Sequence, residues 1–189
     1  MPCYRPLTGY RARDVAASGR RPIVFNVADG YADMEVKLPC GQCIGCKLEH
    51  SRQWAMRCVH EASLYDANSY ITLTYDDDSL PRHRSVDVYI AQLFLKRFRK
   101  RYGKARYFLA GEYGDKFERP HYHAILFDHK FEDQKFFKMH NGNKLYRSAS
   151  LEDLWKGGYS TIGGVTFESA AYVARYCVKK VTGEKTAEH

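Results

Sequence analysis

Residues 119–127 read Arg-Pro-His-Tyr-His-Ala-Ile-Leu-Phe, so two histidines flank one aromatic residue at the head of an apolar run. An apolar run of this length predicts a β-strand. Because side chains alternate between the two faces of a strand, His121 and His123 would share one face, and Tyr122 and Ala124 would lie on the other. Two imidazoles on one face can bind the same metal ion, although the same spacing also occurs on ordinary half-exposed strands.

A second predicted strand, residues 106–113, precedes this one and reads Arg-Tyr-Phe-Leu-Ala-Gly-Glu-Tyr. The turn-rich residues 114–118 follow it, which favours an antiparallel hairpin. Such a hairpin would bring Glu112 near His121 and His123. A carboxylate beside two imidazoles is a suitable ligand set for a divalent cation with open coordination positions. The alternative is a solvated glutamate on an edge strand.

The third element is a predicted helix over residues 170–180, near the end of the chain. Its apolar face is formed by Ala170, Val173, Ala174, Cys177 and Val181. The other side presents Tyr172, Tyr176, Lys179 and Lys180. Two phenols one turn apart beside ammonium groups suit a nucleophile whose phenolate is stabilised by positive charge, and they suit phosphate binding equally well. The alternative is a surface helix whose tyrosines lie along its side.

The charge of the chain predicts a polyanionic partner. Lys and Arg number 30 against 22 Asp and Glu, a net charge of +8. Residues 82–106 hold nine Lys or Arg and one acidic residue, so the excess is concentrated there. A helix over residues 87–102, with Gly103 as its stop, would expose the predicted DNA-binding residues Lys96, Arg97, Lys100 and Arg101. Together with 15 Tyr and 10 Phe, this charge favours single-stranded nucleic acid over a membrane surface, although a basic helix can also be merely solvated.

Three of the six cysteines follow the pattern Cys40-x-x-Cys43-x-x-Cys46. This spacing brings thiolates to one centre and predicts a structural Zn²⁺ ion rather than disulfides in a chain that works inside a cell. A fourth ligand is needed. Cys3 is preferred, with His50 as the local competitor, and Cys58 is expected to be a buried packing residue because it lies far along the helix that begins near Cys46.

The order of predicted elements indicates an α+β fold. We expect an antiparallel sheet covered by helices on one side, a ferredoxin-like arrangement, with short helices over residues 131–139 and 151–155. The first forty residues are expected to be turn-rich, with one strand around residues 23–27. Residues 1–66 are predicted to form an N-terminal extension with the Cys cluster and a helix, and residues 67–189 the core. We expect no membrane-spanning segment and no signal peptide.

The combination of these motifs resembles the HUH endonucleases. Within that superfamily the chain is similar to the replication initiation proteins of microviruses, particularly the gokushovirus branch. The resemblance rests on Gly-Glu-Tyr at 111–113, His-Tyr-His at 121–123 and Tyr-x-x-x-Tyr-x-x-Lys at 172–179, in this order. It extends to residues 38–46, to Ser-Arg-Gln-Trp-Ala at 51–55, and to Ile-Thr-Leu-Thr-Tyr at 71–75, which looks like the first motif of the family.

The resemblance implies a ferredoxin-like HUH sheet and a metal-dependent enzyme that nicks and joins single-stranded DNA. His121, His123 and Glu112 would hold Mn²⁺ or Mg²⁺, and Tyr176 or Tyr172 would form a 5′-phosphotyrosine, leaving a free 3′-hydroxyl for rolling-circle replication. Lys179 would be the catalytic lysine, and Lys180 would contact DNA. The expected partner is a replication origin in the host bacterial cytoplasm, and a host replication helicase is a further candidate.

Two other classes of function stay open at this point. A non-catalytic domain that binds single-stranded nucleic acid on a ferredoxin-like sheet would explain the charge and the aromatic residues, but it would leave the metal set without a task. A zinc-dependent hydrolase could use the His-x-His pair, but it would leave the tyrosine pair without a task. Covalent attachment to single-stranded DNA separates the three.

Overall fold

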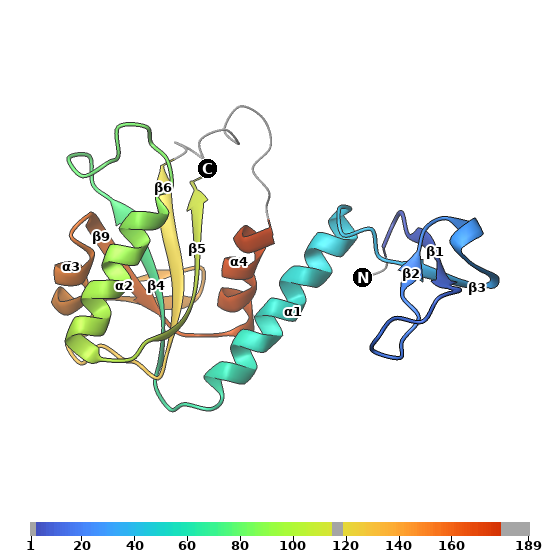
Figure 1. Cartoon of the computed structure of the whole chain (residues 1–189). Coiled ribbons are helices and arrows are strands. Elements are labelled where there is room, and N and C mark those ends of the chain that lie inside the picture. The colour runs from blue at the N-terminus through green and yellow to red at the C-terminus, as the bar shows by residue number, and fades with distance from the viewer. Residues whose placement is uncertain (1–2, 115–118, 179–189) are drawn as a thin grey trace. The chain divides into compact units, whose positions relative to one another are not determined.

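The computed structural model describes residues 3–114 and 119–178, apart from the side chains of the last two (Figure 1). The chain divides into two compact units, Met1–His50 and Ser51–His189. The division falls within helix α1 (Ile44–Ala62). The boundary expected between residues 66 and 67 stays a prediction.

The first unit contains a three-stranded antiparallel sheet with the order β2-β1-β3. Its elements are β1 (Leu7–Ala12), β2 (Ile23–Val24), the 3-10 turn η1 (Val27–Asp29) and β3 (Gly30–Leu38). The strand expected around residues 23–27 is present as β2, whereas β1 and β3 were not expected, so the expectation of a single strand was wrong. Most side chains of β3 are exposed, but residues 33–38, Asp-Met-Glu-Val-Lys-Leu, alternate polar and apolar residues, a strand pattern that the sequence analysis did not use.

The second unit is built on a six-stranded antiparallel sheet with the order β5-β6-β4-β9-β8-β7. The strands are β4 (Asn68–Tyr75), β5 (Arg106–Tyr113), β6 (Pro120–Phe127), β7 (Lys135–His140), β8 (Asn143–Arg147) and β9 (Gly158–Gly163). The remaining helices are α2 (Val88–Tyr102), α3 (Ala149–Trp155) and α4 (Phe167–Val178). The predicted α+β class is therefore confirmed, and the finer ferredoxin-like HUH assignment stays a prediction.

Helices pack on both faces of the six-stranded sheet, which corrects the expectation of one covered face. One core joins sheet residues such as Ile71 and Leu126 to α2 and α3. A second core joins Ile125 and Phe127 to α4 and to the part of α1 in this unit. Figure 1 shows α2 and α3 on one side of the strands and α4 on the other. β6 is buried along almost its whole length, so it has no polar face that would mark an open side.

Residues 131–139 do not form the expected helix. β7 and β8 are instead paired as an antiparallel hairpin, with His140 opposite Asn143. The turn residues Asn141 and Gly142 both have positive φ, 47° and 76°. An Asn-Gly pair in this conformation matches the twist of a two-residue hairpin turn. Its preference for a hairpin outweighed the helix-compatible spacing of the phenylalanines in residues 131–139.

Tyr122 determines which face of β6 the two histidines occupy. Its ring is fully buried in the core with Tyr75 and Trp155. Its hydroxyl donates to the carbonyl of Asp87 at 2.9 Å and accepts the Asp87 N–H at 2.8 Å. Asp87 is also the N-cap of α2, accepting from the Tyr89 N–H. Because neighbours on a strand point to opposite faces, this anchor turns His121 and His123 toward α4.

Candidate functional site

The candidate site is built where β5, β6 and β4 lie side by side. Glu112 on β5 is directly opposite His121 on β6, and Thr72 on β4 is directly opposite His123. Directly paired residues of antiparallel strands share a face. The hairpin expected from the sequence therefore places Glu112 on the same face as both histidines.

His123 is held by hydrogen bonds at both ring nitrogens. Its Nε2 lies 2.8 Å from Glu112 Oε1, and its Nδ1 lies 2.8 Å from the Tyr70 hydroxyl and 3.1 Å from Thr72 Oγ1. A carboxylate can only accept, so Nε2–H is the donor and Nδ1 accepts from the hydroxyls. His123 and Glu112 are both buried, so the ring has a defined orientation and tautomer.

His121 has the opposite arrangement. Its Nδ1 lies 2.5 Å from the carbonyl oxygen of Arg119, which can only accept, so Nδ1–H is the donor. The lone pair of His121 is therefore on Nε2. The rings of His121 and His123 are nearly parallel, with an interplanar angle of 8° and centroids 6.4 Å apart.

Both tyrosines of α4 lie against this group. The Tyr172 hydroxyl donates to Glu112 Oε1 at 3.0 Å, the oxygen that also accepts from His123. The rings of Tyr172 and Tyr176 lie 5.0 and 6.3 Å from the His123 ring, and 5.1 Å from each other. The buried residues Ala170, Val173 and Ala174 anchor the helix from its other side. The structure thus brings the histidines, the glutamate and the tyrosines together.

The electrostatics of the site centre on Glu112. Burial alone would raise the pKa of its carboxyl, but hydrogen bonds from His123, Tyr176 and Tyr172 outweigh burial, so the pKa is lowered and Glu112 is ionised. Burial, the hydrogen bond with Tyr176 and the negative charge of Glu112 all raise the pKa of the Tyr172 phenol. Tyr172 is therefore neutral at physiological pH unless positive charge approaches it. Lys179 and Lys180, predicted to supply such charge, lie outside the described residues.

Sequence reasoning did not assign Tyr70 and Thr72 to the site, although they orient His123. The signal was present in the regular alternation of β4, whose side chains are alternately buried and half-buried from Asn68 to Tyr75. Residues 70, 72 and 74 share one face of such a strand. What the sequence could not show is that β4 pairs with β6 in the register that puts Thr72 opposite His123.

The four predicted zinc ligands meet in the first unit. The Sγ atoms of Cys3, Cys40, Cys43 and Cys46 all lie within 4.8 Å of one another. Within residues 3–114 and 119–178 they form the one group of three or more ligating side chains that is this compact. Cys3, rather than His50, thus completes the set, and four thiolates could bind a metal such as zinc. Cys58 is buried as a packing residue, as expected.

Backbone donors adjust the acidity of these thiols. The Cys46 and Tyr4 amides lower the pKa of Cys43 to about 6, and the Cys43 and Gln42 amides lower the pKa of Cys40. Burial raises the pKa of Cys46 to about 12. The loop therefore favours some thiolates in advance of metal binding, because thiolates are the species that ligate.

We expect protein purified under reducing conditions to contain about one zinc ion per chain, because four thiolates hold Zn²⁺ far more tightly than they hold Mg²⁺ or Mn²⁺. Cys43→Ser should lower the zinc content measured by elemental analysis severalfold. Cys58→Ala is the matched control and should leave it unchanged. A wild-type protein without zinc would contradict the assignment.

The predicted DNA-binding residues of α2 are not brought to this site. α2 packs on the sheet face opposite the histidines. Lys96 and Lys100 are exposed, whereas Arg97 donates to the Trp155 carbonyl at 3.2 Å and Arg101 pairs with Asp153 of α3 at 3.2 Å. Arg97 and Arg101 therefore have contacts within the fold. The role of all four residues in DNA binding stays a prediction.

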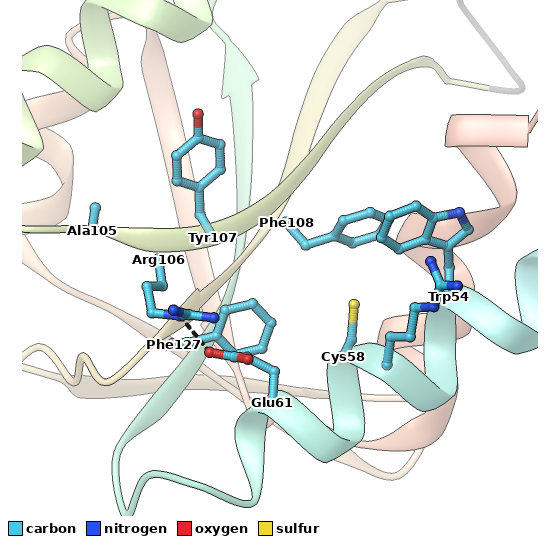
Figure 2. Close-up of a pocket in the computed structure, with 9 residues that line it drawn as sticks. Trp54, Cys58, Glu61, Ala105, Arg106, Tyr107, Phe108 and Phe127 are labelled. Carbon is cyan, nitrogen blue, oxygen red and sulfur yellow. Dashed lines mark ion pairs between the residues drawn. The ribbon is translucent and has the colours of Figure 1, made fainter. Parts of the chain in front are cut away.

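A hollow of about 410 Å³ lies at the other ends of β5 and β6, between these strands and α1. Figure 2 shows the ring of Trp54 beside that of Phe108, with Arg106 and Glu61 paired across the hollow from them. The two rings are stacked with centroids 5.3 Å apart. None of the residues predicted for catalysis lines this hollow.

Comparison with known proteins places these observations in a family. The family model described as replication-associated protein ORF2/G2P matches residues 68–181. Replication-associated protein VP4 of Bdellovibrio phage phiMH2K is 34% identical over 201 residues, which cover 100% of this chain and 61% of that protein. Replication-associated protein ORF2 of Spiroplasma virus 4 is 35% identical, covering 76% of this chain and 48% of that protein. Replication-associated protein ORF4 of Chlamydia phage 1 is 37% identical, covering 80% of this chain and 41% of that protein.

The chain thus spans between 41% and 61% of the length of these relatives. No solved structure matches it. Among the described helices, none has the length and apolar character needed to cross a membrane.

Proposed function

Because the chain belongs to the replication-associated protein ORF2/G2P family, we propose that it starts DNA replication by cutting single-stranded DNA with a tyrosine nucleophile. The observation that carries the proposal is the meeting of Tyr172 and His123 on one buried oxygen of Glu112, at 3.0 and 2.8 Å. Catalytic groups need such fixed geometry, and a surface used only for binding does not.

The donor types at the site suit a divalent cation, although among the described residues the ligand atoms of Glu112, His121 and His123 do not all lie within 4.8 Å of one another. Glu112 Oε2 is buried and has no hydrogen-bond partner among the described residues, as expected of an oxygen that accepts from or ligates something further. His121 Nε2 has its lone pair available, because Nδ1 donates to Arg119. His123 could ligate through Nε2 once the proton is on Nδ1, where the Tyr70 and Thr72 oxygens can accept it.

We propose His121, His123 and Glu112 as ligands of Mn²⁺ or Mg²⁺, with imidazole ligands favouring Mn²⁺. When bound, such an ion draws negative charge from a phosphate and lowers the pKa of nearby hydroxyls. The positive charge of a bound ion would lower the pKa of the Tyr172 phenol, which burial, Tyr176 and Glu112 otherwise raise.

In the proposed reaction, a tyrosine oxygen bonds to the phosphorus and displaces the 3′ oxygen of the neighbouring nucleotide. The tyrosine loses its proton, and the 3′ oxygen takes up a proton to become a free hydroxyl that can prime synthesis. The phosphodiester energy is retained in the 5′-phosphotyrosine, so the strands can be rejoined without a nucleotide cofactor. With the rings of Tyr172 and Tyr176 5.1 Å apart, one can remain bonded to DNA while the other cuts again.

We further propose that the chain acts in a bacterial host on the origin of a circular phage genome, as an HUH endonuclease of rolling-circle replication. The printed names of its phage relatives support a role in replication. Contact with a host replication helicase stays a prediction.

The test is covalent attachment. The protein is incubated with labelled single-stranded DNA from the origin region of its replicon, with Mn²⁺, Mg²⁺ or a chelator. We expect an adduct that survives denaturing electrophoresis, contains phosphotyrosine and disappears with the chelator. Tight binding without any adduct would indicate the non-catalytic alternative, and cleavage without an adduct would indicate a hydrolase.

For the basic helix, we expect Lys96→Gln/Lys100→Gln to weaken binding to unrelated single strands and to reduce the salt dependence. Loss of two phosphate contacts should lower the slope of log K against log[salt] by about 1.4. Arg97 and Arg101 are left unchanged because they contact Trp155 and Asp153. The measurement is a salt titration of affinity, and an unchanged slope would place the DNA path elsewhere.

A further inference from the structure

The hairpin of β7 and β8 exposes large apolar side chains at one edge of the six-stranded sheet. All six residues of β7 are exposed, including Phe136 at 59%, Phe137 at 47% and Met139 at 54%. Large side chains that contribute little to a core are expected on a surface that meets something else. The sequence analysis expected a helix in this region and assigned it no function.

The same hairpin is strongly basic. Residues 135–147 contain Lys135, Lys138, Lys144 and Arg147 and no acidic residue. Arg147 bonds to Glu152 Oε1 through Nε at 2.7 Å, which ties the base of the hairpin to α3. Within the described part of the chain, no ion pair involves the three lysines. Their positive charge is therefore uncompensated by the fold.

Rings and cations are interleaved on this surface. Lys138 Nζ and Arg147 Cζ lie 5.3 and 5.6 Å from the centre of the Phe137 ring, and Phe136 contacts the edge of Tyr146. Exposed rings on which bases can stack, beside cations that contact phosphates, are the chemistry of single-stranded DNA binding. A protein partner would favour fewer lysines at the centre of its interface.

We propose that the β7–β8 hairpin is a binding surface for single-stranded DNA, with Phe136 and Phe137 stacking on bases and Lys135, Lys138 and Lys144 contacting phosphates. This proposal rests on the proposed function, because it identifies where the strand next to the cut is held.

The strand pairing connects this surface with the site. Tyr146 pairs with Ile162, and Ile162 pairs with Ile71 on the face away from the histidines. Because faces alternate along a strand and directly paired residues share a face, Arg147, Lys135 and Lys138 lie on the histidine face, whereas Phe136, paired with Tyr146, and Lys144 lie on the other face. β7 is four positions from β6 in the sheet, which at about 4.8 Å per strand is roughly 19 Å. A single strand could therefore run from Lys135 and Lys138 across the histidine face toward His123, and it would reach Phe136 around the exposed edge of β7.

The test compares three proteins by their affinity for a single-stranded oligonucleotide of about 16 nucleotides and for the blunt duplex of the same sequence. Phe136→Ala/Phe137→Ala removes the rings, and its control is Phe25→Ala/Leu64→Ala, which removes two residues that are 62% and 71% exposed elsewhere. We expect the ring variant to bind the single strand on the order of tenfold more weakly or worse, and the duplex much less affected. Because the hairpin contributes few buried side chains, the thermal unfolding of the ring variant should match that of the control.

A second variant, Lys135→Gln/Lys138→Gln/Lys144→Gln, keeps the rings. Its salt slope for the single strand should fall by about 2, from three lost phosphate contacts, and Lys37→Gln/Lys104→Gln/Lys156→Gln is the charge-matched control. Single-strand affinities equal to those of the controls would overturn the proposal, as would equal losses on single strand and duplex in the ring variant.

Adduct formation is measured in parallel at saturating DNA, so that the two proposals fail separately. A wild-type protein that forms the adduct while both hairpin variants bind normally would overturn the hairpin surface alone. Reduced binding by the hairpin variants, with no adduct in any protein, would support the hairpin surface and overturn the nicking activity.

Discussion

Replacing both Tyr172 and Tyr176 with Phe is expected to abolish the covalent adduct with DNA, a loss of roughly 10⁴-fold or more. Both hydroxyl groups of the α4 pair are then gone, while both rings keep their contacts with His123. Folding should survive, because the cost is the hydrogen bonds from Tyr172 and Tyr176 to Glu112, each on the order of 1 kcal/mol of unfolding free energy. The measurement is adduct yield on a denaturing gel, with thermal unfolding as the check on structure.

The single variants distinguish one nucleophile from two. If the tyrosines alternate, Tyr172→Phe and Tyr176→Phe should each allow some first cleavage but lose the second transfer, which is followed by the joining of two labelled strands. Normal multiple rounds of cutting and joining by Tyr172→Phe would show that Tyr172 only positions other groups. Adduct formation by the double variant would mean that α4 is not the catalytic element.

The second large effect is expected from His121→Ala/His123→Ala. Removing both imidazoles should lower cleavage by about 10³-fold or more, since a metal ion supplies several kcal/mol of transition-state stabilisation. DNA affinity should change little, because it depends mainly on contacts between basic side chains and phosphates. Cleavage at saturating DNA and binding are therefore measured separately.

The matched control is His60→Ala/His83→Ala, in which two exposed histidines outside the site are replaced. It should cleave and bind as the wild type does. A full rate of cleavage by the His121/His123 variant would remove the metal assignment. Proportionate loss of binding and cleavage in that variant would instead indicate that the two histidines contact DNA.

Some features followed from the sequence alone because they depend on local periodicity. The apolar run in residues 119–127 predicted a strand, and the alternation of side chains along a strand put both histidines on one face. The buried position of Tyr122 beside Asp87 and Trp155 confirms that the histidines lie on the opposite face from it. The apolar spacing and the stop at Gly103 predicted a helix over residues 87–102, which differs from α2 by one residue because Asp87 is its N-cap. The cysteine spacing predicted three ligands of a common centre, which lie together as expected.

Other features could not be read locally. The choice of Cys3 over His50 required the path of a chain that returns from residue 3 to residue 40, where the Cys40 amide donates to Cys3 Sγ. Residues 131–139 have a spacing compatible with a helix, and the energy of the Asn141-Gly142 turn and the pairing with β8 decided otherwise. The strand β3 alternates polar and apolar residues over 33–38, but its pairing with β1 is not visible in either segment taken alone.

The sequence by itself therefore determined which residues carry chemistry and which face of each element they occupy, because faces follow from the 2.0 and 3.6 residue periods of strand and helix. Only the tertiary structure decided which faces meet. Strand register puts Glu112 opposite His121 and Thr72 opposite His123, and the packing of α4 brings the Tyr172 hydroxyl to Glu112. Packing also placed helix α2, with its basic residues, on the sheet face opposite the histidines. It left the β7–β8 hairpin exposed at the edge of the sheet. These outcomes depend on the burial of two separate cores, a long-range property that no local pattern in the chain contains.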